Sequence, residues 1–156
     1  MRVYRICDES HAKKAFRGDG ARIYGGRWNK PGVALVYASA TQSLAALELL
    51  VHLDPEEFPA SLTVVSADIP EGLRILEIGL ARLPSDWQAY PGPESLQTMG
   101  TRWVTENHFA VISVPSAIIP SERNFLVNPK HPDFSRIIIH KPTPFTLDPR
   151  LWKKSK

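Results

Sequence analysis

The chain has 156 residues, a length that suits one domain with a buried core and leaves little room for a second. Hydrophobic residues make up 43% and charged residues 22% of it, which is typical of a globular protein and argues against a disordered or coiled-coil chain. Its longest apolar runs are far shorter than the roughly 20 residues that span a bilayer, and its N-terminus lacks the pattern of a signal peptide. We therefore expect a cytoplasmic protein that does not enter a membrane.

The net charge is +3 and the sequence pI is about 9.1, which is compatible with nucleic acid, an anionic small molecule or an acidic protein as partner. Part of this charge belongs to a short basic tail at 148–156, which contains Lys153, Lys154 and Lys156. The other basic residues are dispersed, and none of them forms a stripe rich in aromatic residues. We therefore expect no direct binding of nucleic acid by this chain.

Turn residues and hydrophobic periodicity predict the elements of the first half of the chain. In chain order we expect a strand at 3–6, a helix at 10–16 capped by Ser10, an irregular loop at 18–31, a strand at 33–38 and a helix at 42–53. Within the loop, residues 23 and 24 are predicted to be extended. Ser39 or Thr41 can cap the helix that follows the second strand.

The second half is predicted to contain more strands than helices. We expect strands at 62–69, 73–78, 110–114, 125–127 and 135–140, a helical turn at 83–90, a helix at 93–106 and a last helical turn at 148–153. Strands and helices mix without regular alternation, and 14 prolines favour many short elements. The sequence therefore predicts an α+β fold in a single domain over 1–156, with its core at about 3–140.

Glu48 stands out on the predicted helix at 42–53. Leu44, Leu47 and Val51 form an apolar stripe at helical spacing, and Glu48 falls on the same face. Because an unpaired buried charge is costly, an inward carboxylate needs a partner or a purpose. Either Glu48 sits at the edge of the helix and reaches solvent or an arginine, or it lines a pocket.

Two glycines, Gly25 and Gly26, precede Arg27 in the predicted loop. They permit positive φ angles and close backbone approach, so they can present the Arg27 guanidinium in a geometry suited to phosphate oxygens. The alternative is an ordinary turn with an exposed arginine. Ten residues further on, Tyr37 ends a predicted strand, as a core aromatic or as part of a site next to the Glu48 helix.

Ser116 follows a predicted strand and Pro115, without the glycines of a nucleophile elbow, so a serine hydrolase is not expected. It remains a candidate hydrogen-bonding residue of a pocket, and Asn124 or Asn128 is a candidate to tie loops together. The lone Cys7 reads as a small buried side chain. The five histidines lack the spacing of metal ligands, and we expect no metal site.

Taken in order, these segments resemble the RES domain family. The resemblance runs through Arg5 in 3–6, Arg27 in 25–29, 36–39, Glu48 in 45–48, 114–117 and 124–129, and it covers about Val3 to His140. The arginine, glutamate and serine positions for which the family is named match Arg27, Glu48 and Ser116. Arg5 is either a further site residue or a structural one.

The resemblance implies a compact α+β fold similar to ADP-ribosyltransferases of the diphtheria-toxin type. It also implies that the chain is a bacterial toxin with NAD⁺ as its substrate, without a further cofactor, and with an Xre-type antitoxin as partner in a hetero-oligomeric complex. Family members deplete NAD⁺ by hydrolysis or phosphorolysis, or transfer ADP-ribose to a protein, and the resemblance does not choose between these outcomes.

Side-chain chemistry and the resemblance together suggest a role for each site residue. Glu48 would bind a ribose hydroxyl and stabilise the oxocarbenium-like transition state of nicotinamide–ribose cleavage. Arg27 would bind pyrophosphate or ribose oxygens, and Tyr37 would stack on nicotinamide or close the pocket. Ser116 would fix Glu48 or the ribose, and Asn124 would contact the substrate. The alternatives are an ADP-ribosyltransferase acting on one protein, an RNA-targeting toxin and a non-catalytic interaction module.

Overall fold

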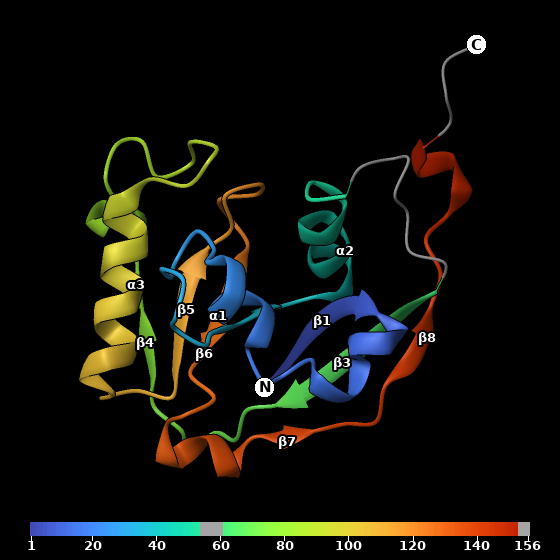
Figure 1. Ribbon diagram of the computed structural model, residues 1–156, viewed down its shortest axis with the longest axis horizontal. Helices are drawn as coiled ribbons and strands as arrows, with labels where there is room; N and C mark the ends of the chain where they lie inside the picture. Colours follow the sequence, from blue (N-terminus) through green and yellow to red (C-terminus); the bar gives the residue numbers. More distant parts are fainter. Residues whose placement is uncertain (54–60, 153–156) are drawn as a thin grey trace.

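The structure, a computed structural model, describes residues 1–53 and 61–152 (Figure 1). Its strands form one eight-stranded sheet in the order β4-β5-β6-β2-β1-β3-β7, and β8 also pairs with β3. Neighbouring strands run antiparallel, except that β4 and β5 are parallel. The strands are β1 (Arg2–Asp8), β2 (Val36–Ser39), β3 (Leu62–Asp68), β4 (Ile75–Glu77), β5 (Val111–Pro115), β6 (Arg123–Val127), β7 (Ile138–Ile139) and β8 (Thr143–Phe145).

Short helices accompany this mixed sheet. The α-helices are α1 (Asp19–Tyr24), α2 (Gln42–Leu50) and α3 (Glu94–Glu106), and the 3₁₀ helices are η1 (Glu9–Lys14), η2 (Leu80–Arg82), η3 (Pro132–Arg136) and η4 (Pro149–Trp152). None of the helices within 1–53 and 61–152 is long and apolar enough to cross a membrane. The arrangement confirms the α+β class that the sequence predicts.

Alternation along the strands gives the sheet two apolar faces. On one face, Val36 and Ala38 of β2 belong to a core cluster that η1 and Phe16 cover. On the opposite face, α3 packs through Leu96 and Trp103 on β5 and β6. Farther along the same face α2 packs against β1 and β3 (Figure 1). Helices α2 and α3 therefore leave part of this face between them.

The predicted site residues lie on that face. Tyr37 is the neighbour of Val36 in β2 and points to the opposite side, as Ser39 does two residues later. Asn124 of β6 is paired in register with both Ser39 and Val114. The antiparallel pairing of β2, β6 and β5 thus brings three separate segments to one place beside α2.

Several predicted elements of the N-terminal part are wrong. The expected helix at 10–16 is the 3₁₀ helix η1, and its cap is Asp8, whose carboxylate accepts from the Ser10 backbone N–H, rather than Ser10 itself. The expected loop at 18–31 contains α1, so residues 23 and 24 are helical and not extended. No residue of α1 is buried, which explains why hydrophobic periodicity gave no signal there.

Other elements are present with different bounds. Thr41 caps α2 through its side chain, which confirms one of the two expected caps, but α2 ends at Leu50. Val51 is the C-cap and is 56% exposed, so its place in the apolar stripe was wrong. In place of the strand expected at 135–140, η3 extends to Arg136 and only Ile138–Ile139 form the strand β7. The strand β8 was not predicted. The tail lysines at 153–156 lie outside the described residues.

Candidate active site

The Glu48 carboxylate on α2 meets the ends of β5 and β6. Its Oε1 atom accepts a hydrogen bond from Ser116 Oγ at 2.8 Å and a second from Asn124 Nδ2 at 2.5 Å. The described residues supply no hydrogen-bond partner for Oε2. One carboxylate oxygen is therefore held by the protein, and within 1–53 and 61–152 the other has no protein donor.

Ser116 is a donor whose direction is fixed. The residue follows Pro115 at the end of β5 and is fully buried. Its Oγ accepts hydrogen bonds from the backbone N–H groups of Ile118 and Ile119, both at 3.1 Å. Because these two bonds use the acceptor capacity of the hydroxyl, its single proton points to Glu48.

Asn124 joins Glu48 to a second serine. While Nδ2 donates to Glu48, Oδ1 accepts a hydrogen bond from Ser39 Oγ at 2.8 Å. The Asn124 amide is thus satisfied at both ends, between the last residue of β2 and the carboxylate on α2. The loop-tying role that the sequence suggested for Asn124 or Asn128 belongs to Asn128, which bonds Asn107 and Lys130, while Asn124 links a strand to a helix.

Arg27 is half-buried and held by the segment that precedes α3. Its Nη1 donates to the carbonyl oxygens of Trp87 at 2.6 Å and Ala89 at 2.9 Å. Burial lowers the pKa of the Arg27 guanidinium below its ordinary value. The nearby Glu48 and Tyr37 offset part of this shift. The alternative of a simple exposed arginine is therefore wrong, and Arg27 lies close enough to Glu48 to interact with its charge.

Tyr37 holds the loop that carries Arg27. Its hydroxyl donates to Asn29 Oδ1 at 2.7 Å and accepts from the Trp28 backbone N–H at 2.9 Å. Burial raises the pKa of the Tyr37 hydroxyl, so it stays neutral. Gly25 has a φ of 73°, and a Cβ at Gly26 would lie 2.6 Å from the Tyr37 hydroxyl oxygen. Both glycines are thus required for the geometry that the sequence suggested.

Arg5 contacts the backbone of the same strand. Its Nη1 donates to the Tyr37 carbonyl oxygen at 2.8 Å, and its buried Nε has no partner within 1–53 and 61–152. Burial lowers the pKa of the Arg5 guanidinium. Since Arg5 alternates with Tyr4 and Ile6, which face α2, its side chain leaves the sheet on the opposite face. This placement favours a structural role for Arg5 over a role as a further site residue.

The structure brings Glu48, Ser116 and Asn124 into direct contact and places Arg27 close by. Tyr37 has no hydrogen bond to Glu48. It supports Arg27 through its hydrogen bonds to Trp28 and Asn29, which follow Arg27 in the loop. Their catalytic and substrate-binding roles remain predictions. Sequence reasoning missed Ser39 as part of this group, because it was considered only as a helix cap; its position two residues after Tyr37 on the same strand face was the available signal.

An aromatic pair joins the segment that follows α2 to the segment that anchors Arg27. The rings of His52 and Tyr90 have centroids 6.4 Å apart and a tilt of 45°. His52 follows Glu48 by four residues, and Tyr90 follows Ala89, whose carbonyl holds Arg27. Tyr90 is 81% exposed. Neither residue was singled out from the sequence, because an exposed aromatic residue gives no periodic signal.

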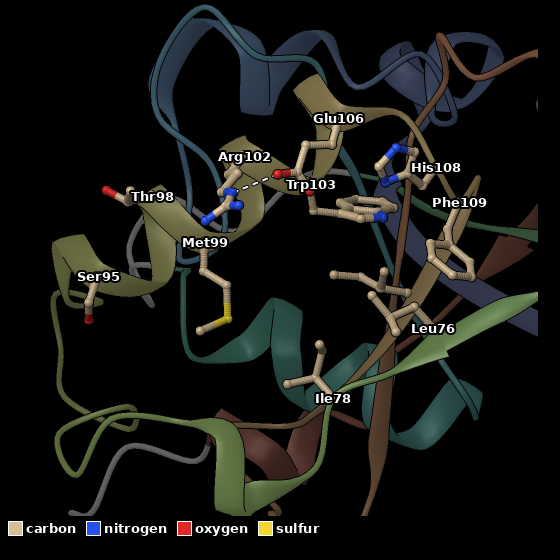
Figure 2. A pocket seen from close by; sticks show the side chains of 11 residues that line it. Leu76, Ile78, Ser95, Thr98, Met99, Arg102, Trp103, Glu106, His108 and Phe109 are labelled. Atoms are coloured by element: carbon tan, nitrogen blue, oxygen red, sulfur yellow. Dashed lines mark hydrogen bonds and ion pairs between the residues drawn. The ribbon is translucent and has the colours of Figure 1, made fainter.

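A cavity of about 450 Å³ lies elsewhere, between α3 and the edge of the sheet at β4 (Figure 2). Its walls are mainly apolar, with Met99, Trp103 and Phe109 among them, and its rim carries the Arg102–Glu106 ion pair at 2.6 Å. None of the predicted site residues lines it. Its one carboxylate is already paired, so this cavity does not offer the chemistry of the Glu48 group.

The described part of the chain holds no group of three or more His, Cys, Asp or Glu residues that could bind a metal ion. Cys7 is half-buried, and burial raises the pKa of its thiol above the ordinary value. A neutral thiol is a poor nucleophile, which agrees with its expected packing role.

Comparison with known proteins identifies relatives over the full length. The model of the RES domain matches residues 2–148. "Toxin Res" of Photorhabdus laumondii is 39% identical over 158 aligned residues and covers 100% of both chains. "Prs ADP-ribosylating toxin" of Sphingobium sp. is 37% identical over 156 residues and covers 97% of both.

The fold has a counterpart among solved structures. A chain of the M. tuberculosis MbcT–MbcA toxin–antitoxin complex superposes with a TM-score of 0.73 at 18% identity, covering 93% of this chain and 84% of that one. This similarity confirms the fold that the family resemblance implied. The sequence relatives and the domain match together show that the chain belongs to the RES domain family.

Proposed function

We propose that this chain is the toxin of a toxin–antitoxin pair and that it cleaves the nicotinamide–ribose bond of NAD⁺. The observation that carries the proposal is the Glu48 carboxylate, whose Oε1 is held by Ser116 and Asn124 and whose charge is felt by the nearby Arg27. NAD⁺ is the substrate in this account, and no cofactor is required.

The chemistry suits a fixed carboxylate. The bond between the anomeric carbon and the nicotinamide nitrogen breaks, and its electron pair leaves with nicotinamide, which becomes neutral. Positive charge develops on the ribose ring in an oxocarbenium-like transition state. Because the leaving group is already cationic in the substrate, no strong general acid is needed. Glu48 Oε2 can bind a ribose hydroxyl while the carboxylate stabilises the developing charge.

Ser116 and Asn124 support this role by orienting the carboxylate before the substrate arrives. Two donors on one oxygen fix the plane and direction of the Glu48 side chain. A preorganised charge loses little energy to reorganisation during the reaction, which is the usual source of its catalytic effect.

Arg27 is suited to the pyrophosphate. The two carbonyl bonds of Nη1 fix the guanidinium, while Nε and Nη2 have no hydrogen-bond partner among the described residues. These two donors form one side of a planar fork that matches the oxygens of a phosphate. Tyr37 and Asn29 keep the loop in place, and the predicted contact of Tyr37 with nicotinamide remains part of the proposal.

The His52–Tyr90 pair supports a substrate that carries aromatic bases. Exposed aromatic rings offer a stacking surface, and this pair lies within four residues of Glu48 on one side and next to the Arg27 anchor on the other. A dinucleotide presents a base, a ribose and a pyrophosphate, and the site presents a partner for each.

A second candidate outcome is the transfer of ADP-ribose to a cellular protein. The name of the Sphingobium relative, an ADP-ribosylating toxin, favours it. Both outcomes share the same bond cleavage and differ only in the acceptor that attacks the anomeric carbon. Attack by water forms ADP-ribose and releases a proton, and attack by phosphate forms the 1″-phosphate ester of ADP-ribose. Attack by a protein side chain leaves ADP-ribose attached to that protein.

The antitoxin is the proposed partner. The structural neighbour was solved as a toxin–antitoxin complex, and the family resemblance implies an Xre-type protein in a hetero-oligomeric assembly. Such a partner would keep the producing cell alive by blocking the site. Co-expression of a tagged toxin with its Xre-type antitoxin should yield a stable complex without nicotinamide-releasing activity.

Incubation of the purified toxin with NAD⁺ labelled in the adenosine part tests the reaction and its acceptor together. We expect release of nicotinamide, with the label in a small molecule in buffer or phosphate. Label attached to protein only in the presence of cell lysate would select the transferase outcome. If no nicotinamide is released under either condition, the proposed function is wrong.

A further inference from the structure

Ser39 ends β2 beside Asn124, on the face of the sheet that carries the site, and its hydroxyl does not bond Glu48. The side chain is buried, with 3% of the residue exposed, and its hydroxyl donates to Asn124 Oδ1 at 2.8 Å. It has no other side-chain hydrogen bond among the described residues. The hydroxyl therefore serves the Asn124 amide.

The hydrogen bonds around Glu48 all run in one direction. Ser39 donates to Asn124, and Asn124 donates to Glu48 Oε1. On the other side, backbone N–H groups donate to Ser116, and Ser116 donates to the same oxygen. A carboxylate can only accept, so the amide must turn its nitrogen toward Glu48 and its oxygen toward Ser39.

A hydrogen bond accepted by an amide oxygen polarises the amide and strengthens donation from its nitrogen. Ser39 thus acts on the carboxylate through two consecutive hydrogen bonds. The Ser39 hydroxyl also satisfies the buried Asn124 Oδ1. Without it, the cost of an unpaired acceptor would favour other positions of the Asn124 side chain.

We propose that Ser39 is a positioning residue for Glu48 and that it acts through Asn124. The inference rests on the proposed function only in taking Glu48 as the catalytic carboxylate. It predicts that Ser39 affects the rate of the chemical step and does not contribute to the binding of NAD⁺, since Ser39 is buried and its hydroxyl donates to Asn124.

Ser113 provides a matched control. It is another strand serine with 3% exposure, and its hydroxyl accepts from Arg123 Nε at 2.9 Å instead of joining the Glu48 group. Removing either hydroxyl therefore deletes one buried hydrogen bond of the same sheet. Only Ser39→Ala disturbs the link to Glu48.

The test is a double-mutant cycle on nicotinamide release with Ser39→Ala, Ser113→Ala and Asn124→Ala. We expect Ser39→Ala to lower kcat about three- to tenfold with KM unchanged, and to have no further effect in the Asn124→Ala background. Ser39→Thr, which keeps the hydroxyl, should recover activity. Ser113→Ala should lower the melting temperature comparably and leave kcat near that of the wild type.

The proposal is overturned if the Ser39→Ala and Asn124→Ala effects multiply, or if Ser113→Ala lowers kcat as much. Should Ser39→Ala not fold, Ser39→Cys replaces it, because a thiol has similar size and donates weakly. If the wild type releases no nicotinamide, the proposed function fails. The extent of growth arrest after induction is then measured for the same set of variants. If the effects of Ser39→Ala and Asn124→Ala on growth arrest are independent of each other, the role of Ser39 is wrong as well.

Discussion

Ser116 and Glu48 lie 68 positions apart in the sequence, and the Ser116 hydroxyl donates to Glu48 Oε1 at 2.8 Å. This bond joins the residue that follows β5 to the last turn of α2. The same hydroxyl accepts two backbone N–H groups, so it links the turn at 116–119 to the carboxylate.

Ser116→Ala is therefore expected to lower kcat and leave the binding of NAD⁺ nearly unchanged. Hydrogen bonds to charged groups contribute about 1.5–3 kcal/mol, which corresponds to a loss of roughly ten- to a hundredfold in rate. Steady-state kinetics of nicotinamide release measure both constants. Ser95→Ala, an exposed serine of α3, serves as control. A large rise in KM with unchanged kcat would show that Ser116 contacts the substrate instead of positioning Glu48.

Arg27→Lys tests whether a planar guanidinium is needed. A lysine can donate to one acceptor from the same place, but it cannot hold two carbonyls and still present a fork to phosphate oxygens. We expect KM for NAD⁺ to rise at least tenfold while the protein remains folded. The matched control is Arg102→Lys on α3, an arginine in a surface ion pair. Equal kinetics for the two variants would contradict a phosphate-binding role of Arg27.

The sequence predicted several residues of the candidate site, but it did not predict Ser39 or the contacts among these residues. Arg27, Glu48 and Ser116 were found because glycines, an inward carboxylate and a serine after a strand are local signals, and because the family resemblance joined them. The pairing of Ser39 with Asn124 depends on the register of β2 and β6. Register is a long-range property of the sheet, and hydrophobic patterns do not determine it.

Tyr37→Phe tests the support of the Arg27 loop. The variant keeps the ring and removes the hydroxyl, which leaves the Trp28 N–H and Asn29 Oδ1 without their partner. The free energy of unfolding should fall by about 1–3 kcal/mol, the usual cost of leaving a buried polar group unsatisfied. Urea denaturation measures it. An unchanged unfolding curve would mean that water or another group replaces the hydroxyl.

Asp68 predicts a dependence of stability on pH. The hydrogen bonds from Arg2 and His140 hold the pKa of this carboxyl well below its usual range. A carboxyl whose pKa is lowered by folding stabilises the native state above its unfolded value of about 3.9, and this contribution is lost as the pH falls toward the folded value.

Asp68→Asn should therefore be less stable than the wild type near neutral pH, and the difference should shrink as the pH falls below about 4. Urea denaturation of both proteins at several pH values gives this comparison. The pair is exposed, so a modest effect is expected. A difference that grows on acidification would show that the ion pair does not stabilise the junction of β1, β3 and β7.

The fold itself was predicted unevenly, for identifiable reasons. Strands β1, β3, β5 and β6 and helices α2 and α3 carry apolar residues at regular spacing, and their positions were found. Helix α1 buries no residue, and β8 has only one half-buried residue, so neither has a periodic signal. The 3₁₀ helices η1 and η3 are held by side-chain caps from Asp8 and His131, which short propensity patterns do not reveal.

The most direct test of the account is the NAD⁺ level of cells after induction of this chain without its antitoxin. Wild type is compared with Glu48→Gln and with Glu106→Gln, a surface glutamate paired with Arg102. We predict that NAD⁺ falls rapidly with wild type and Glu106→Gln. Loss of the Glu48 charge should slow turnover about 10²- to 10³-fold, so NAD⁺ should be maintained in that variant. Arrested growth with unchanged NAD⁺, or depletion by a folded Glu48→Gln protein, would contradict the account.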